Sequence, residues 1–178
     1  MSADEIAALT QQQQAKLWQR VLNHATTGFQ YLYRHYAIAE YIDQGFNPGH
    51  PLHSLKDFVD SEVFLNLLKT ITGFDVDCYS DVYATCYGRG HFLLDHNDKA
   101  EAAAGRLAAW VLNMTPEWRA DWGGHLLFYD DKGNVQQGFI PAYNTLNMFA
   151  VPQSQGVAYV PPFAGAERLS VMGWLRTS

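Results

Sequence analysis

The residues numbered 83–98 read YATCYGRGHFLLDHND and decide how the rest of the chain is interpreted. Two short runs of residues that favour strands flank a Gly-Arg-Gly turn, so the stretch predicts strands on either side of it. The second run ends on His96-Asn97-Asp98. Residues two positions apart on a strand point to the same side, so this imidazole and this carboxylate can reach one metal ion. A site made of two histidines and one carboxylate would then need its remaining ligand from a distant strand.

The chain downstream of this stretch keeps a period near two, with short apolar runs separated by Gly, Asp and Pro. These runs predict strands at residues 126–129, 135–140, 145–150, 157–160 and 168–175. Asp131-Lys132-Gly133-Asn134 has the composition of a hairpin turn between the first two. The small and polar residues 99–105 predict a loop at the mouth of the barrel that the strands would form.

The chain upstream predicts mainly helices. Ser2 and Glu5 fit a capping box at the start of an amphipathic helix. Further predicted elements are a weak strand at 29–33, a helix at 37–44, a loop at 47–51, and helices with N-caps Ser54 and Ser61, the last ended by Gly73. Helices first and strands afterwards predict an α+β, mainly β fold: a jelly roll (double-stranded β-helix) over residues 75–178, buttressed by helical support in residues 1–74. We expect residues 1–178 to form a single domain.

The composition argues against several classes of protein. A hydrophobic content of 48% and an aromatic content of 14% are typical of a globular chain rather than a disordered one. The formal net charge of −6 disfavours nonspecific nucleic-acid binding, which needs a basic surface. Two cysteines suggest no disulfide framework. Neither a secretory leader nor an apolar segment of membrane-spanning length is evident, so we expect a cytoplasmic protein without a membrane partner.

Three segments of the chain resemble the 2-oxoglutarate/Fe(II) dioxygenases, in particular their prolyl-hydroxylase-like branch. The resembling segments are residues 86–98, 122–126 and 168–174, which occur in the family's order. The resemblance implies a jelly-roll oxidoreductase that uses Fe(II) and 2-oxoglutarate as co-substrate, with ascorbate as a further candidate cofactor. It also implies that a prolyl residue of a protein or peptide is hydroxylated, although a small-molecule substrate is the other interpretation.

The resemblance assigns a role to several residues. His96 and Asp98 match the iron ligands that the family also treats as catalytic. Arg168 matches the basic residue that binds the distal carboxylate of 2-oxoglutarate, and Ser170 would face the same way and donate another hydrogen bond. Tyr87 matches a tyrosine that donates its hydroxyl to the same carboxylate. As a buried tyrosine it could equally be a core residue with a backbone partner.

The last iron ligand departs from the family pattern. Where the family has His-x-Val, this chain has Gln155-Gly156-Val157, and no histidine occurs after His125. A carboxamide oxygen is neutral, as imidazole is, but it is a weaker donor for Fe(II). Three interpretations follow: Gln155 supports weak iron binding with turnover, the chain has lost catalysis but binds ligands, or this position has been engineered. His125 is the downstream imidazole that could compensate.

These observations lead to one preferred function and two others. The preferred function is a 2-oxoglutarate- and Fe(II)-dependent hydroxylase. The second is a catalytically impaired or inactive jelly-roll protein that keeps the 2-oxoglutarate and metal pocket as a binding module. The third is a metal-free interaction module, in which Arg168 and Tyr87 would be structural. Trp174 matches an aromatic residue near the substrate pocket of the family, and packing is its other interpretation.

Overall fold

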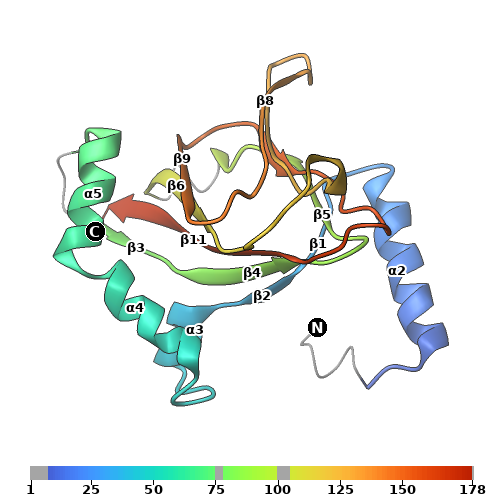
Figure 1. Cartoon of the computed structure of the whole chain (residues 1–178), viewed down its shortest axis with the longest axis horizontal. Helices are drawn as coiled ribbons and strands as arrows, with labels where there is room; N and C mark the ends of the chain where they lie inside the picture. The colour runs from blue at the N-terminus through green and yellow to red at the C-terminus, as the bar shows by residue number, and fades with distance from the viewer. Residues whose placement is uncertain (1–7, 75–77, 100–104, 178) are drawn as a thin grey trace.

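The computed structural model describes residues 8–74, 78–99 and 105–177. Two antiparallel sheets face each other, and helices lie against the outer side of one of them (Figure 1). The predicted α+β, mainly β jelly roll with helical support is confirmed. The predicted capping box at Ser2 and Glu5, and most of the predicted loop at 99–105, lie outside the described residues.

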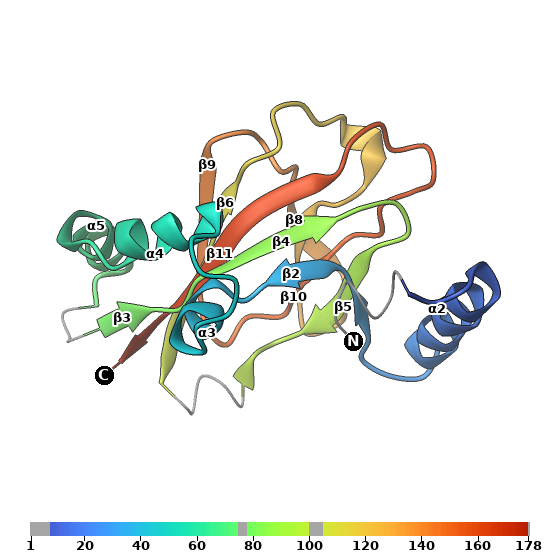
Figure 2. The ribbon, with the colours of Figure 1, turned by 90° about the horizontal axis from the view of Figure 1, so that it is seen from below.

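Sheet A and sheet B divide the strands between them. Sheet A has the order β1 (Tyr31–Leu32), β5 (Phe92–His96), β10 (Gln155–Val157), β7 (Leu126–Tyr129) and β8 (Val135–Phe139). Sheet B has the order β2 (Arg34–Tyr36), β4 (Tyr83–Tyr87), β11 (Arg168–Thr177), β6 (Arg106–Asn113) and β9 (Thr145–Ala150), and β3 (Cys78–Ser80) also pairs with β11. Figure 2 shows β11 and β4 side by side through the middle of sheet B.

The helices are set by local signals in the sequence. They are α2 (Gln11–Ala25), α3 (Ile38–Asp43), α4 (Ser54–Val59) and α5 (Glu62–Thr72), with 3-10 turns η1 (Pro51–His53) and η2 (Ala120–Trp122). A capping box between Thr10 and Gln13 starts α2. Ser61 caps α5 as predicted, and Gly73 ends it in the left-handed region with φ of 73°.

The main core lies between α3, α4, α5 and the outer face of sheet B. Trp110, Val171 and Leu175 point outward from the sheet and pack with buried residues of the three helices, Ile38, Val59, Phe64 and Leu68. Phe64 meets the Trp110 ring edge-on, with ring centroids 5.1 Å apart. Since residues alternate between the two faces of a strand, the neighbours of these core residues point into the space between the sheets. No helix in the described part of the chain combines the length and apolar character that a bilayer span requires.

Two local predictions were wrong, and a further strand is shorter than predicted. Ser54 is not an N-cap; it is the first residue of α4 and its hydroxyl donates to the Pro51 carbonyl. The strand predicted at 157–160 is displaced: β10 ends at Val157, although the N–H groups of Ala158 and Val160 still donate to the carbonyls of His125 and His91. The strand predicted at 29–33 is present but shorter, since β1 covers Tyr31–Leu32 in sheet A and the next strand, β2, begins at Arg34 in sheet B.

Candidate active site

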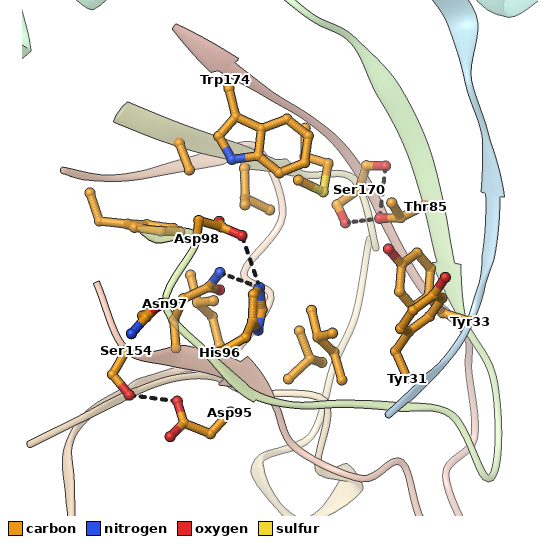
Figure 3. Close-up of a pocket in the computed structure, with 18 of the residues that line it drawn as sticks. Tyr31, Tyr33, Thr85, Asp95, His96, Asn97, Asp98, Ser154, Ser170 and Trp174 are labelled. Carbon is orange, nitrogen blue, oxygen red and sulfur yellow. Dashed lines mark hydrogen bonds and ion pairs between the residues drawn. The ribbon is translucent and has the colours of Figure 1, made fainter. Parts of the chain in front are cut away.

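A cavity of about 680 Å³ lies between the two sheets. The six residues to which the sequence assigned metal or 2-oxoglutarate binding all line it, as does Trp174. The six are Tyr87, His96, Asp98, Gln155, Arg168 and Ser170. Figure 3 shows several of them projecting into the same space from both sides. The volume is in the range of small-molecule and cofactor sites, which are usually largely formed before the ligand binds.

His96 and Asp98 converge on one side of the cavity. His96 ends β5, and its Nδ1 lies 3.0 Å from the Leu94 carbonyl oxygen. That contact assigns the ring proton to Nδ1, so Nε2 presents a lone pair to the cavity. Nε2 lies 3.6 Å from Asp98 Oδ1 (Figure 3). The other carboxylate oxygen of Asp98 is buried and has no hydrogen-bond partner within the described residues.

The convergence of these two side chains has a different cause from the one that the sequence suggested. β5 ends at His96, so Asp98 is not on the strand. Its backbone instead adopts the left-handed region, with φ of 49°. Asp and Asn tolerate this conformation better than most residues do. A turn, rather than strand alternation, therefore directs the carboxylate back toward the imidazole.

Gln155 lies directly opposite His96 in the pairing of β10 with β5. Its side chain is buried, and its Nε2 donates to His96 Nε2 over 2.8 Å. Gly156 allows the close approach of the two strands, because a Cβ there would lie 2.8 Å from the Leu93 carbonyl oxygen. Rotating the carboxamide by half a turn would present its oxygen, instead of its nitrogen, next to the imidazole.

The three side chains fit a divalent cation. An imidazole lone pair, a carboxylate with an unsatisfied oxygen and a carboxamide meet at one place. Neutral imidazole and oxygen donors suit Fe(II). Elsewhere in residues 8–74, 78–99 and 105–177, no group of three His, Cys, Asp or Glu side chains converges in a way that could hold a metal. A third protein ligand beside His96 and Asp98 would therefore be a side chain of another type, and Gln155 is in contact with His96.

Arg168 occupies another part of the same cavity. It is only 2% exposed, its Nε has no hydrogen-bond partner, and no acidic side chain of the described residues pairs with it. Its guanidinium carbon lies 5.1 Å from the centre of the Tyr87 ring. Burial lowers the pKa of Arg168, because it disfavours the charged form. A buried guanidinium without a partner calls for an anionic ligand.

Hydroxyl groups on the same two strands, β4 and β11, line the cavity together with this arginine. Ser170 lies two residues further along β11, and its hydroxyl is 2.7 Å from that of Thr85 on the neighbouring strand (Figure 3). Tyr87 stands opposite Arg168 in the pairing of β4 with β11 and is 3% exposed. Burial raises the pKa of Tyr87, so its phenol keeps its proton and can donate a hydrogen bond. The pocket thus offers a cation and several neutral hydroxyls to a carboxylate.

Several cavity residues were not expected from the sequence. Thr85 could have been found, because it lies two positions before Tyr87 on the same strand and must share its face. Phe29, Tyr31 and Tyr33 also line the cavity. The sequence predicts a weak strand at these positions, but nothing local shows which sheet it borders. His125 does not line the cavity, so its position does not support a compensating role.

The sequence comparison agrees with the site. A model of the 2OG-Fe(II) oxygenase superfamily matches residues 82–176, which is more than half of the chain. The chain therefore belongs to this superfamily, whose members use Fe(II) and 2-oxoglutarate, and the predicted family and cofactors are confirmed. The matched range contains all six of these cavity residues.

Individual relatives point to the prolyl-hydroxylase-like branch. The chain is 34% identical over 119 residues to a prolyl 3-hydroxylase, OGFOD1, of Xenopus laevis, an alignment that covers 64% of this chain and 23% of that protein. The corresponding protein of Mus musculus is 32% identical over 119 residues, with 64% of this chain and 21% of that protein covered. The chain thus spans less than a quarter of the length of these curated relatives.

Solved structures show the same fold. A prolyl-4-hydroxylase of Pseudomonas putida superimposes with a TM-score of 0.60 at 21% sequence identity, covering 100% of this chain and 89% of that one. An oxidoreductase of the 2OG-Fe(II) oxygenase family from Burkholderia pseudomallei gives a TM-score of 0.58 at 15% identity, covering 70% of this chain and 55% of that one. At these identities the likeness concerns the fold alone.

Proposed function

We propose that this chain is a 2-oxoglutarate- and Fe(II)-dependent oxygenase that hydroxylates a prolyl residue of a protein or peptide. One observation carries the proposal: the buried Arg168, without an acidic partner among the described residues, shares a cavity with His96, Asp98 and Gln155. An anion site and a metal site in one cavity suit a ligand that chelates a metal at one end and carries a carboxylate at the other. 2-Oxoglutarate is such a ligand.

The proposed roles follow from the contacts. His96, Asp98 and Gln155 hold Fe(II), with His96 held in its orientation by the Leu94 carbonyl. Arg168 binds the distal carboxylate of 2-oxoglutarate, and Tyr87 and Ser170 add hydrogen bonds to it. When both are bound, iron and 2-oxoglutarate supply the oxidation of an unactivated C–H bond by O₂, with 2-oxoglutarate converted to succinate and carbon dioxide. The protein residues orient these groups and exclude water.

The choice of a prolyl substrate is supported by the relatives that are named prolyl hydroxylases. A protein or peptide partner and a cytoplasmic location stay predictions, as does the absence of a nucleic-acid or membrane partner. Ascorbate stays a prediction as well.

A second candidate function is a binding module without turnover. The observation that favours it is the 2.8 Å contact between Gln155 Nε2 and His96 Nε2, in which the amide covers the lone pair that a metal would need. To replace this contact with a metal bond, the Gln155 carboxamide would have to rotate so that its oxygen faces the metal. A protein that does not complete this exchange would bind 2-oxoglutarate through Arg168 alone.

An anaerobic titration tests the proposal and separates the two candidates. Adding Fe(II) to the protein with 2-oxoglutarate should produce the weak visible charge-transfer band of the chelate, and admitting O₂ should then release succinate. The matching titration without 2-oxoglutarate should show no band. If 2-oxoglutarate binds but neither the band nor succinate is seen, the binding module is the correct function. Failure of 2-oxoglutarate to bind at all would contradict both.

A further inference from the structure

Three aromatic side chains form a continuous wall along one side of the cavity. Phe29, Tyr31 and Tyr33 occupy alternate positions of an extended segment, and all three line the cavity. The ring centroids are 6.0 Å apart between Phe29 and Tyr31, and 5.5 Å apart between Tyr31 and Tyr33. Figure 3 shows the rings of Tyr31 and Tyr33 lying close together at the side of the cavity. We call these three residues the aromatic wall.

The aromatic wall connects the two functional parts of the cavity. At one end, the Phe29 ring lies 5.4 Å from the His96 ring, which is a proposed metal ligand. At the other end, Tyr33 stacks on Tyr87 with centroids 4.7 Å apart, and Tyr87 lies beside Arg168. The Tyr33 end thus adjoins the proposed 2-oxoglutarate site, whereas the Phe29 end adjoins the proposed metal.

The wall closes the side of the cavity where the two sheets are not joined by strand pairing. β1, which contains Tyr31, is the edge strand of sheet A, and β2, which begins one residue after Tyr33, is the edge strand of sheet B. The segment therefore crosses from one sheet edge to the other (Figure 2). It precedes residues 82–176, so it lies outside the part of the chain that the superfamily model matches.

The outer part of the wall is exposed, although it is apolar. Phe29 is 55% exposed and Tyr31 is 49% exposed, while Tyr33 is partly buried. Burial raises the pKa of Tyr33 to about 12, so this ring is uncharged. Adjacent aromatic rings that stay exposed at the mouth of a cavity are typical of a binding surface rather than of a core.

We propose that the aromatic wall docks the proline-bearing segment of the polypeptide substrate, with a pyrrolidine ring stacked on Phe29 and Tyr31. The inference rests on the proposed function and deepens it. Proline-rich segments adopt an extended left-handed helix before they bind, and aromatic-lined grooves recognise them at low entropic cost. Because Phe29 adjoins His96, a proline held there lies next to the proposed metal. The wall therefore selects which residue reaches the reacting centre.

The backbone of β1 adds a second contact for an extended peptide. Among the described strands β1 pairs with β5 alone, through Tyr31 with Leu93 and Leu32 with Phe92. Its other edge has no strand neighbour among the described strands, although the Tyr31 N–H donates to the Gln30 side-chain oxygen over 3.0 Å. An extended chain can bind such an edge. Aromatic rings and an edge strand on one short segment suit a peptide better than a compact small molecule.

Decaproline labelled with fluorescein tests this inference by fluorescence anisotropy on the full chain. We expect wild-type protein to bind the probe, and Phe29→Ala and Tyr31→Ala each to weaken binding about fivefold to tenfold, the effect of one lost aromatic contact. Tyr31→Phe keeps the ring and should bind as wild type does. Tyr143→Ala is the matched control, because Tyr143 is 58% exposed and does not line the cavity. Thermal unfolding of every variant verifies that it is folded.

The outcomes separate this inference from the proposed function, because 2-oxoglutarate binding to wild-type protein is measured in parallel. If 2-oxoglutarate binds and decaproline does not, or if it binds equally to wild type, Phe29→Ala and Tyr31→Ala, the docking role is wrong and the proposed function stands. If decaproline binding depends on both rings but 2-oxoglutarate does not bind, the wall is a proline-binding surface and the proposed function is wrong.

Discussion

Alternate residues of the strands of sheet B face the helices on one side and the cavity on the other. The two sides differ in whether their buried polar groups have hydrogen-bond partners. On the outer face, Trp110 is 1% exposed and packs among helix residues, and its indole nitrogen donates to Ser80. On the inner side, Arg168 keeps a buried polar atom without a partner in the described chain, and so does Asp98, which reaches the same cavity from the turn after β5. The buried indole of the outer face thus finds its partner within the protein, whereas these groups of the cavity do not.

The outer face of sheet B contributes mainly to stability, and the cavity on its inner side contributes mainly to binding. Burial of the apolar residues on the outer face supplies much of the favourable free energy of folding. The unpaired guanidinium in the cavity opposes folding, because burying a charge without a partner is unfavourable. The apolar burial between the helices and the outer face therefore offsets the unfavourable free energy of burying the Arg168 guanidinium in the cavity. Substitutions on the two sides should change different measured quantities.

The largest expected effect is the loss of metal binding from the cavity. His96→Ala and Asp98→Ala should each abolish Fe(II) binding, because two remaining donors, one of them a carboxamide, hold the ion too weakly. Neither change should unfold the chain, since both residues are partly exposed at the cavity. Anaerobic calorimetric titration measures the affinity. Asp95→Asn is the control, because this neighbouring carboxylate is exposed and accepts from Ser154. Unchanged iron affinity in either alanine variant would sink the metal-site assignment.

A core substitution on the outer face should show the opposite behaviour. Leu68 on α5 is fully buried, so Leu68→Ala should lower the free energy of unfolding by about 2–5 kcal/mol. Val63→Ala on the same helix is the matched control, because Val63 is 79% exposed and its loss should change stability by less than about 0.5 kcal/mol. Urea unfolding measures both. A similar decrease in the free energy of unfolding in both variants would show that Leu68 is not part of the core between α5 and sheet B.

Arg168→Ala tests whether the inner side of sheet B contributes to binding rather than to stability. It should weaken 2-oxoglutarate binding by about 2–4 kcal/mol, because a charge-assisted pair is lost. It should not lower stability in the absence of ligand, since it removes an uncompensated buried charge. Calorimetry and urea unfolding measure the two quantities. Arg119→Ala is the control, because its side chain is 68% exposed and pairs with Asp121. Equal 2-oxoglutarate affinity in wild type and Arg168→Ala would show that Arg168 is structural.

Gln155→His should have the smallest effect of the four and the opposite sign. Imidazole is the better donor for Fe(II), so the substitution should tighten iron binding by at least about tenfold, or about 1.4 kcal/mol. It should also raise succinate release in the absence of a substrate. Gln155→Asn is the comparison variant, because it keeps the carboxamide but shortens its reach. An iron affinity that is the same in wild type and Gln155→His would mean that the side chain at this position does not face the metal.

Much of the architecture could be predicted because it depends on local signals. Ser61 and Gly73 bound α5 through the backbone contacts of a helix end, and Asp131–Asn134 form the predicted turn between β7 and β8. The strands at 145–150 and from 168 onward follow from alternation alone. Where a local signal was ambiguous, prediction failed: a serine before a helix can cap it or can lie inside its first turn, as Ser54 does.

The membership of His96, Asp98, Arg168 and Gln155 in one site could be proposed from the sequence, because the motifs that contain them resemble those of the family and occur in its order. Their arrangement in space could not be proposed in this way. Gln155 contacts His96 across 59 positions of sequence, and that contact depends on the register between β10 and β5. The left-handed turn at Asp98 and the crossing of residues 29–33 between two sheet edges are likewise products of the folded chain. Pairing between distant strands is set by the packing of the whole sheet, and the aromatic wall exists only where that packing places it.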